Sequence, residues 1–440
     1  AEPLTDIFNT SLREGTVPVQ WKEAVVTPIP KEMPAVINKL RPISLTAIFA
    51  KICEGIVGKW VMSDIWNSVD KRQFGGIKRS STSHYLVSLT DFLYQGAERS
   101  KNVGTIILTD FTKAFDAINH RQAILKLLNM GTRPSIVPWI VNFLTERQQR
   151  VRYGLTLSEC ETLTAGVPQG TKLGPIIFLC MINDACHSFS DRWKYVDDLS
   201  LGENRHNSDE SHLQDQANSL EKWTDSAQLK LNPGKCFVFS VCFMRNPSPP
   251  VPISLCGNLL TTVEIAKVLG VWLQSNLKWD KHVSETTKKG NKRLFMLRRL
   301  KTFGVPVKDL VTVYCGFIRA ILEYCAPVWH HGLTRKQAAT IEGVQKRACR
   351  IILGHTYTDY KSALRVCNLE TLETRRETLC TKFAHSMTAS ERTADLLPST
   401  RRQEHGRNLR NSDKRTMVPC RTTRYQNSPV PSLLRLLDKK

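Results

Sequence analysis

Two adjacent carboxylates in an apolar, β-prone segment constrain this chain more than any other feature of its sequence. Asp197 and Asp198 follow Val196 and precede Leu199 and Leu201. Burying unpaired anions is costly, so a carboxylate pair set into a strand near the core requires a compensating cation. A bound divalent metal supplies that cation, and metal-held phosphate chemistry gives a very basic protein a use for it.

A third acid, Asp110, ends another apolar run, residues 104–110. Three carboxylates from two strand ends are the minimum for a two-metal nucleotidyl-transfer site. In such a site one metal lowers the pKa of an attacking 3′-hydroxyl, and the other holds the triphosphate. Mg²⁺ prefers oxygen ligands, so carboxylates suit a pair of Mg²⁺ ions, with Mn²⁺ as a substitute.

Successive residues of a strand point to opposite faces, so Asp197 and Asp198 can face one site only if the chain twists between them. We therefore expect unequal roles, with Asp110 and Asp197 bridging both metals and Asp198 as an accessory ligand. The alternative is a pair of surface turn aspartates and an unrelated, helix-capping Asp110. The apolar residues around the pair favour the metal site.

The charge balance indicates a polyanionic partner. Sixty-two Lys and Arg against forty Asp and Glu give the 440 residues a net charge of +22 and a pI near 9.6. Nucleic acid is the usual partner of such a chain, and a merely soluble basic protein is the alternative.

We expect an intracellular protein, in the nucleus or the cytoplasm, with no membrane partner. The sequence has neither a continuous apolar run of transmembrane length nor a signal peptide at its start. Its 13 cysteines are never spaced C-x-x-C, which indicates reduced thiols and no zinc module. Because no initiator Met is present, we expect an excerpt of a longer protein.

Hydrophobic periodicity predicts an α+β chain that becomes all-helical after about residue 283. Strands are predicted over 104–110, 236–243 and 266–273, with a hairpin over 193–202. Helices are predicted over 114–130, 136–149, 175–183, 211–229, 284–301, 306–326 and 335–353. Residues 391–440 combine many Lys and Arg with little periodicity, so we expect a mobile basic tail there.

Two segments carry candidate nucleotide contacts. Phe115 lies five residues after Asp110, where its ring could lie under the sugar of an incoming nucleotide and exclude a 2′-hydroxyl. Residues 166–175 place three Gly and two Pro around Gln169. Since glycine lets backbone approach a ligand and proline stiffens a loop, we predict that Gln169 and Gly170 contact the nucleotide. The alternatives are a core phenylalanine and an ordinary loop before a helix.

Three cations stand in proline-stiffened or turn segments. Arg41 is a candidate triphosphate clamp, because its guanidinium fork matches phosphate oxygens. Lys31 is a candidate nucleic-acid contact, and Lys235, in the turn 231–235, could donate a proton to pyrophosphate. In each case the alternative is a solvated surface cation.

The segment that follows mixes aromatic and basic residues. Trp279 either offers a plate for a primer strand or packs in the core. The predicted helix after it carries Lys288, Lys292, Arg293 and Arg298, which could track the phosphates of a duplex. A solvated basic helix face is the alternative.

In their order and rough spacing these segments resemble the reverse transcriptase of a non-LTR retrotransposon, of the jockey-like LINE kind. The resemblance runs from about residue 7 to about residue 354. One departure is Val196, where alanine is commoner in LINE enzymes, and we expect it to be tolerated. The resemblance rests on Arg41-Pro-Ile-Ser-Leu45, Gln73-Phe-Gly75, 110–116, 166–175, 195–198, 231–235 and 269–271.

The resemblance implies a right-hand polymerase with fingers and an N-terminal extension over 1–103, a palm over 104–282 and a helical thumb over 283–354. Residues 355–440 would be a basic region without a predicted structure. The implied roles are metal-binding catalytic carboxylates for Asp110, Asp197 and Asp198, sugar selection for Phe115, and nucleotide contacts for Arg41, Gln169 and Lys235.

The implied activity is RNA-directed DNA polymerisation on an RNA template with a DNA primer and dNTPs, with target DNA as a partner of the full element. No counterpart of the family's upstream endonuclease is found, so we expect this piece to copy RNA without cutting its target. One alternative is an RNA polymerase of the same palm architecture, against which Phe115 argues. The other is a catalytically silent RNA-binding remnant of such an element.

Overall fold

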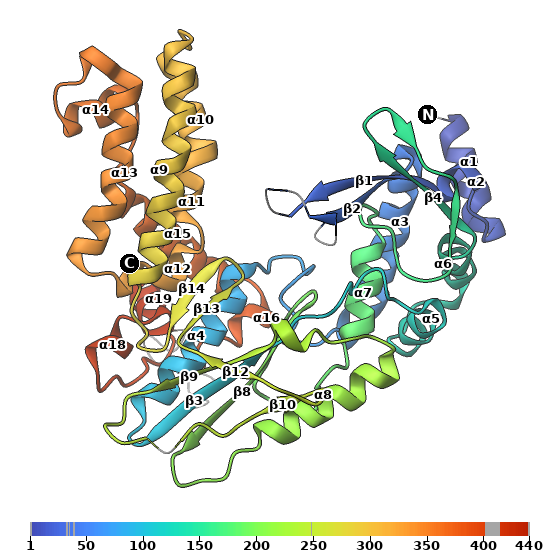
Figure 1. Ribbon diagram of the computed structural model, residues 1–440, viewed down its shortest axis with the longest axis horizontal. Coiled ribbons are helices and arrows are strands. Elements are labelled where there is room, and N and C mark those ends of the chain that lie inside the picture. Colours follow the sequence, from blue (N-terminus) through green and yellow to red (C-terminus); the bar gives the residue numbers. More distant parts are fainter. Residues whose placement is uncertain are drawn as a thin grey trace.

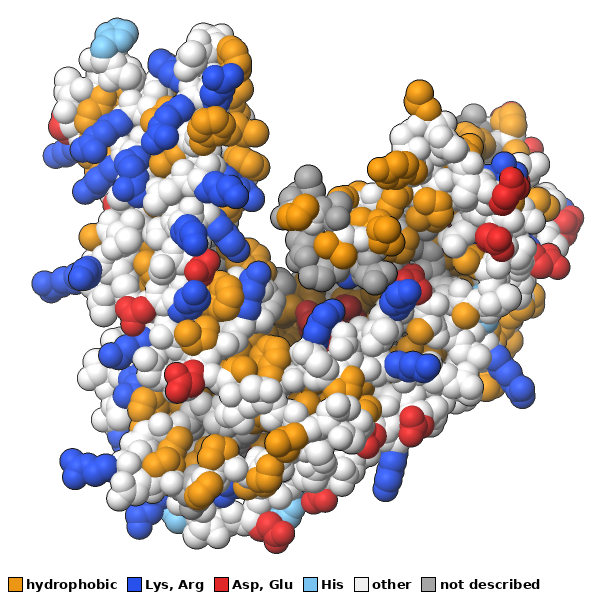
Figure 2. Space-filling model, in the orientation of Figure 1, with side chains coloured by type: hydrophobic (Ala, Val, Ile, Leu, Met, Phe, Trp, Pro, Cys, Tyr) orange, Lys and Arg blue, Asp and Glu red, His pale blue; other side chains and the backbone are white. Residues whose placement is uncertain are grey.

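The computed structural model describes residues 2–31, 34, 36–37, 40–247, 249–400 and 414–438. Two lobes rise from opposite ends of a central sheet, an N-terminal lobe on one side and a column of helices on the other (Figure 1). The molecular surface is deeply hollowed between them (Figure 2). The combination of sheets and helices confirms the predicted α+β class.

The central sheet has the strand order β12-β9-β3-β8-β7. Ile106 and Ile107 of β3 are both fully buried, although successive strand residues face opposite sides. Helix α4 (Thr82–Glu98) packs with Ile106 on one face, and α8 (Leu213–Ala227) packs with Ile107 on the other. Helices therefore cover both faces of the sheet, and only the ends of its strands face the hollow between the lobes. In the order given, the strands are Thr261–Val263, Phe237–Cys242, Asn102–Leu108, Asp198–His206 and Arg192–Tyr195.

The N-terminal lobe is built on a second sheet. Strand β1 (Glu23–Pro30) pairs antiparallel with β2 (Leu40–Leu45) and parallel with β4 (Arg147–Tyr153). Two short strands, β5 and β6, each pair antiparallel with β4. The remaining elements of this region are β5 (Thr156–Leu157), β6 (Glu161–Leu163), α1 (Glu2–Glu14), α2 (Val19–Lys22), α3 (Ile48–Ile65), α5 (His120–Asn129), α6 (Val137–Leu144) and α7 (Gly174–Ile182).

The helical column begins with a hairpin of β13 (Ile265–Val268) and β14 (Val271–Gln274), which leads into α9 (Asp280–Thr302). Helix α9 lies alongside α13 (Arg335–Leu353). On α13 the side chains of Ile341, Val344 and Ala348 are fully buried.

The run Val307–Gly332, between α9 and α13, has the length and composition of a membrane-crossing helix, with a mean hydropathy of 1.3. It is not one helix, because a π-helical turn at Tyr314–Arg319 and the left-handed Cys325 (φ 51°) interrupt it. Ile318 and Leu322 within it are fully buried in the same core as α9 and α13. This run, predicted as one helix over 306–326, is thus an interrupted series of helices packed in the core. Its helices are α10 (Val307–Val313), α11 (Ala320–Glu323) and α12 (Ala326–Trp329).

Two predicted helices are shorter than expected. The helix predicted over 114–130 begins only at His120, where Asn119 supplies the N-cap. The helix predicted over 136–149 ends at Leu144, because the chain then enters β4.

The strand predicted over 266–273 is the β13–β14 hairpin. Leu269 (φ 44°) and Gly270 (φ 89°) form its turn. Leucine rarely adopts a positive φ, so the local sequence signalled the reversal only through Gly270.

The prediction of a mobile tail over 391–440 is wrong for the residues that the structure describes, and the region over 355–440, for which the sequence predicted no structure, contains helices. Helix α19 packs against α15 and α4, and its Leu433 and Leu434 are 0% and 2% exposed. The charge of the tail as a whole concealed this short apolar run. Residues 401–413 lie outside the described residues. The C-terminal helices are α14 (Tyr360–Val366), α15 (Leu372–Thr388), α16 (Glu391–Ala394), α18 (Thr423–Gln426) and α19 (Pro429–Asp438).

Candidate active site

The strand register brings three aspartates to one end of the central sheet. Strands β3 and β8 pair antiparallel, and Thr109 continues the pairing because its N–H and hydroxyl donate to Leu199 O at 3.1 and 2.9 Å. In this register Asp110 falls opposite Asp198, and directly opposite residues share a face of the sheet. Asp197 lies beside them, in the two-residue turn between β7 and β8.

Burial and neighbouring charge raise the pKa values of Asp197 and Asp198. Surrounding protein atoms desolvate Asp198, and the charges of Asp197 and Asp110 act in the same direction, so its pKa rises to about 7. Desolvation and the charge of Asp110 also raise the pKa of Asp197, while Lys31 and Arg41 oppose this rise. The site therefore holds more negative charge than the protein itself balances.

This donor set fits hard divalent cations. Carboxylate oxygens are the ligands that Mg²⁺ prefers, and the side chains of Asp197 and Asp198 are exposed to solvent. Asp110 has its side chain 37% exposed and so is accessible as well. The pKa values of Asp197 and Asp198 are raised, and an ion held by these residues would supply positive charge that stabilises their ionised forms.

Lys235 and Asn232 hold Asp110 from one turn. Lys235 Nζ lies 3.2 Å from Asp110 Oδ2. Asn232 donates its backbone N–H to Asp110 O at 2.8 Å and its side-chain amide to Oδ2 at 3.4 Å. Sequence reasoning singled out Lys235 but missed Asn232, whose place in the same turn was the available signal.

The loop 166–175 is fastened to β2, the strand that carries Arg41. Ser44 N donates to Gln169 O at 2.7 Å. Gly170 (φ 132°) lies so close to β2 that an added Cβ would be 2.5 Å from Ser44 O. Only glycine fits there, so the loop and Arg41 are held on the same side of the hollow.

A buried carboxylate fixes the other half of this loop. Glu54, 1% exposed on α3, accepts from the backbone N–H groups of Lys172 and Leu173 at 2.7 and 3.2 Å. Burial raises its pKa, and the two backbone donors oppose that rise. The loop is therefore tied to the lobe at both ends.

Phe115 and Gln169 lie in two loops that contact each other. Phe115 O accepts from Val167 N at 2.9 Å, and the Phe115 ring stacks on Phe178 with centroids 4.7 Å apart. Gln169 Nε2 donates to Asp116 Oδ1 at 3.1 Å. Phe115 is half-buried, so part of its ring stays accessible to a nucleotide. Asp116, which sequence reasoning assigned no role, orients the amide of Gln169.

Of the predicted nucleic-acid contacts on α9, three side chains are exposed and one packs on an aromatic ring. Lys288, Lys292 and Arg298 are exposed on α9, where Lys and Arg side chains line the helical column (Figure 2). Arg293 instead lies over the Phe317 ring at 4.1 Å.

Trp279 is buried, with 3% of its surface exposed, and its ring lies 6.0 Å from that of His282. Core packing, the alternative considered for it, therefore holds. The prediction that it stacks on a primer strand is wrong, because no base can reach a buried ring.

A cluster of His330, His331 and Glu377 has ligand atoms that all lie within 4.8 Å of one another. Its hydrogen bonds explain it without a metal. His330 Nδ1 accepts from Arg376 Nε at 3.3 Å, which places the ring proton on Nε2, 3.3 Å from Glu377 Oε2. That nitrogen therefore has no free lone pair for an ion.

Comparison with known proteins decides the family. The family model described as "Reverse transcriptase (RNA-dependent DNA polymerase)" matches residues 29–273, more than half of the chain. This chain belongs to the reverse transcriptase family. The matched range includes every aspartate of the site and the loop 166–175.

Two relatives of this reverse transcriptase-family chain come from mobile elements of Drosophila melanogaster. The probable RNA-directed DNA polymerase from transposon BS is 29% identical over 83% of this chain and 42% of the relative. The RNA-directed DNA polymerase from mobile element jockey is 26% identical over 63% and 32%. These matches confirm the resemblance to jockey-like non-LTR elements, and the chain spans less than half the length of these relatives.

A solved structure of telomerase from Candida albicans, in complex with a fragment of telomeric RNA, is 13% identical to this chain. It matches with a TM-score of 0.40 over 89% of this chain and 67% of that chain. A likeness this distant has no bearing on function.

Proposed function

We propose that this chain is the polymerase part of a jockey-like non-LTR element, an RNA-directed DNA polymerase that adds dNTPs to a primer 3′-hydroxyl. One observation carries the proposal. In a member of the reverse transcriptase family, Asp110, Asp197 and Asp198 meet at the end of a central sheet, where desolvation and the charges of the other two aspartates raise the pKa of Asp198 to about 7.

The three aspartates would hold two divalent ions, Mg²⁺ by their ligand chemistry and Mn²⁺ as a substitute. When bound, such ions lower the pKa of the primer 3′-hydroxyl and stabilise the departing pyrophosphate. Lys235 keeps Asp110 oriented until substrate arrives and then lies within reach of the phosphates. Arg41, whose charge reaches Asp197, would bind the triphosphate through its guanidinium fork.

Phe115 would close the sugar side of the site. Its half-buried ring is braced by Phe178 and cannot yield easily, so a 2′-hydroxyl would collide with it. Gln169, oriented by Asp116, and the bare backbone of Gly170 would contact the base or the sugar. This arrangement favours dNTPs over rNTPs.

The hollow between the lobes would hold the RNA template and the DNA primer. In that assignment residues 1–103 form the fingers, 104–282 the palm and 283–354 the thumb. Lys288, Lys292 and Arg298 of α9 would contact duplex phosphates, with Lys31 on the opposite rim. Target DNA would be a partner of the full element, which would act in the nucleus or the cytoplasm.

Primer extension tests the proposal. The purified chain is given a primed RNA template with dNTPs or rNTPs, in Mg²⁺ or EDTA. We expect metal-dependent dNTP incorporation that Asp197→Asn lowers by about 100-fold or more, because a metal ligand is lost. The matched control is Asp225→Asn, an exposed aspartate on α8 that is not one of the three at the end of the sheet.

Two outcomes would contradict the proposal. Incorporation of rNTPs alone would identify an RNA polymerase of the same architecture. Tight RNA binding by wild-type protein without any extension would identify a silent RNA-binding remnant.

A further inference from the structure

A short segment of the chain docks on the strand that leads into the turn of Asp197. Phe74 N donates to Lys194 O at 2.8 Å, and Lys194 N donates to Arg72 O at 3.0 Å. Gln73 and Lys194 pair as in a parallel sheet. Residues 72–74 therefore pair with β7, the edge strand of the central sheet.

The side chain of Gln73 reaches the turn itself. Its Oε1 accepts from Val196 N at 3.1 Å and from Gly75 N at 2.9 Å, and the residue is 1% exposed. Gly75 approaches so closely that an added Cβ would lie 2.6 Å from Val196 N. The Gln73-Phe-Gly75 motif thus holds the turn by a hydrogen bond and by backbone contact.

Val196 requires such support. Its φ of 58° lies in the left-handed region, which is strongly disfavoured for a β-branched residue. A two-residue hairpin turn with positive φ at its first position ordinarily carries Gly there. Since the local sequence disfavours this conformation, tertiary contacts have to maintain it, and Asp197 and Asp198 follow directly in the chain.

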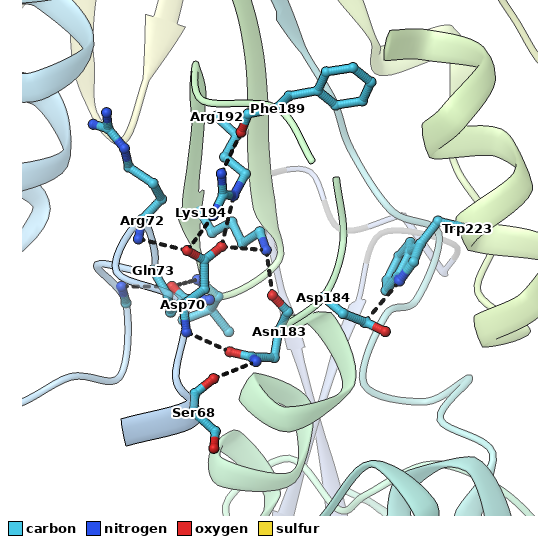
Figure 3. A network of polar contacts seen from close by, with 12 residues as sticks. Ser68, Asp70, Arg72, Gln73, Asn183, Asp184, Phe189, Arg192, Lys194 and Trp223 are labelled. Carbon is cyan, nitrogen blue, oxygen red and sulfur yellow. Dashed lines mark hydrogen bonds and ion pairs between the residues drawn. The ribbon is translucent and has the colours of Figure 1, made fainter. Parts of the chain in front are cut away.

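An ion network holds the start of the docked segment (Figure 3). The carboxylate of Asp70 accepts from Arg192 Nε and Nη2 at 2.9 and 2.7 Å, and Lys194 Nζ lies 2.7 Å from it. Asn183, at the end of α7, accepts from Asp70 N through Oδ1 at 2.8 Å and from Lys194 Nζ through its backbone O at 2.7 Å. Asp70, Lys194 and Asn183 each contact the other two, and Arg192 binds Asp70 through two nitrogens.

The C-terminal region supports the same segment. Arg392 of α16 donates to Gln73 O at 3.3 Å. Lys71 Nζ lies 3.4 Å from the Asp395 carboxylate. The ion network and the C-terminal region therefore both hold the segment, and together they fix the position of the Gln73 side chain.

We propose that Gln73 is a positioning residue for polymerisation: its amide oxygen holds the N–H of Val196, keeps the turn in its left-handed conformation and so directs Asp197 and Asp198 toward Asp110. Gln73 touches no substrate and acts through the turn. The inference rests on the proposed function and adds a residue to which that function assigned no role.

Gln73→Met tests the inference, because methionine keeps the volume and removes the acceptor. We expect kcat for dNTP addition to fall about 10- to 100-fold, the scale of a displaced reacting group, with KM for dNTP and template–primer affinity within about twofold of wild type. The matched control is Gln216→Met, a 7% exposed glutamine of α8 that donates to Gly202 O at 3.2 Å and should keep wild-type kcat.

A second variant separates positioning from general destabilisation. Glycine adopts positive φ without strain, so adding Val196→Gly to Gln73→Met should restore part of the lost kcat, whereas it should not raise kcat in Gln216→Met. No recovery in the double variant would overturn the inference. So would wild-type kcat in Gln73→Met, or an equal fall in Gln216→Met.

Amide hydrogen exchange on peptides that span Val196 gives a readout independent of polymerisation. Gln73→Met should speed exchange at this turn at least about 10-fold, since the N–H loses its acceptor, and Gln216→Met should not. Equal exchange in the two variants would overturn the inference. If the wild-type chain does not extend primers, the proposed function fails, and the exchange result still decides the role of Gln73.

Discussion

Replacing Asp70 by Asn should destabilise the fold far more than replacing Lys194 by Met. The Asp70 carboxylate lies between Arg192 and Lys194, and the side chains of Asp70 and Lys194 are 1% and 0% exposed. Asn keeps the shape of the side chain but leaves two buried cations without a counter-charge. Met at position 194 leaves the fork between Asp70 and Arg192 intact and removes one cation.

The magnitudes follow from these contacts. Removing one partner of a buried ion pair costs about 3–5 kcal/mol, and Asp70 serves two cations, so we expect the upper part of that range for Asp70→Asn. Lys194→Met loses the hydrogen bond to Asn183 O and should cost about 1–2 kcal/mol. A domain is stable by only about 5–15 kcal/mol, so the two variants are readily distinguished.

Guanidinium unfolding of the full chain at several pH values measures this difference. Burial alone would raise the pKa of Asp70, but the hydrogen bonds and charges of Arg192 and Lys194 outweigh it and hold the pKa well below the usual range. A carboxyl with a depressed folded pKa stabilises above its unfolded pKa, about 3.9, and loses that stabilisation as the pH falls further. The difference in unfolding free energy between wild type and Asp70→Asn should be constant from about pH 5 to 8 and should shrink below about pH 4.

Two results would refute this reasoning. Equal unfolding free energies for Asp70→Asn and Lys194→Met would show that the second cation does not depend on Asp70. A gap that persists undiminished to about pH 2 would show that its carboxylate charge is not what stabilises the network.

Three further outcomes are expected. Phe115→Ala should lower the preference for dNTPs over rNTPs at least about 10-fold in primer extension, because the sugar side opens; unchanged preference would remove its assigned role. Lys292→Ala should weaken RNA–DNA binding and lower the salt slope by about 1, whereas Arg293→Ala, which loses the contact with Phe317, should mainly lower the melting temperature. Burial raises the pKa of Asp91 to about 7, so wild-type stability should decline between about pH 4 and 7. Asp91→Asn should then be more stable by roughly 2–4 kcal/mol at pH 8 and equal near pH 4, as judged by unfolding midpoints.

The sequence was sufficient where a periodic pattern meets a polar stop. The apolar run before Asp110 and the hairpin around Asp197 and Asp198 predicted the strand ends that the structure contains. It was insufficient where one pattern fits two environments. Trp279 sits among basic residues whether it stacks on a base or packs against His282, and only its burial separates the two.

Long-range contacts explain the other omissions. The bond from Val196 N to Gln73 joins residues 123 positions apart and depends on how residues 72–74 dock on β7. No local pattern encodes that docking. Likewise, the positive φ of Val196 contradicts its own propensity, because the surrounding fold overrides the local preference.

The seating of α19 on α4 has a consequence for synthesis of the protein. Helix α4 (Thr82–Glu98) is synthesised long before α19 (Pro429–Asp438), so the part of α4 that α19 covers stays uncovered on the ribosome until α19 emerges. A copy of the gene with an early stop codon would yield a chain that displays this surface to chaperones and proteases.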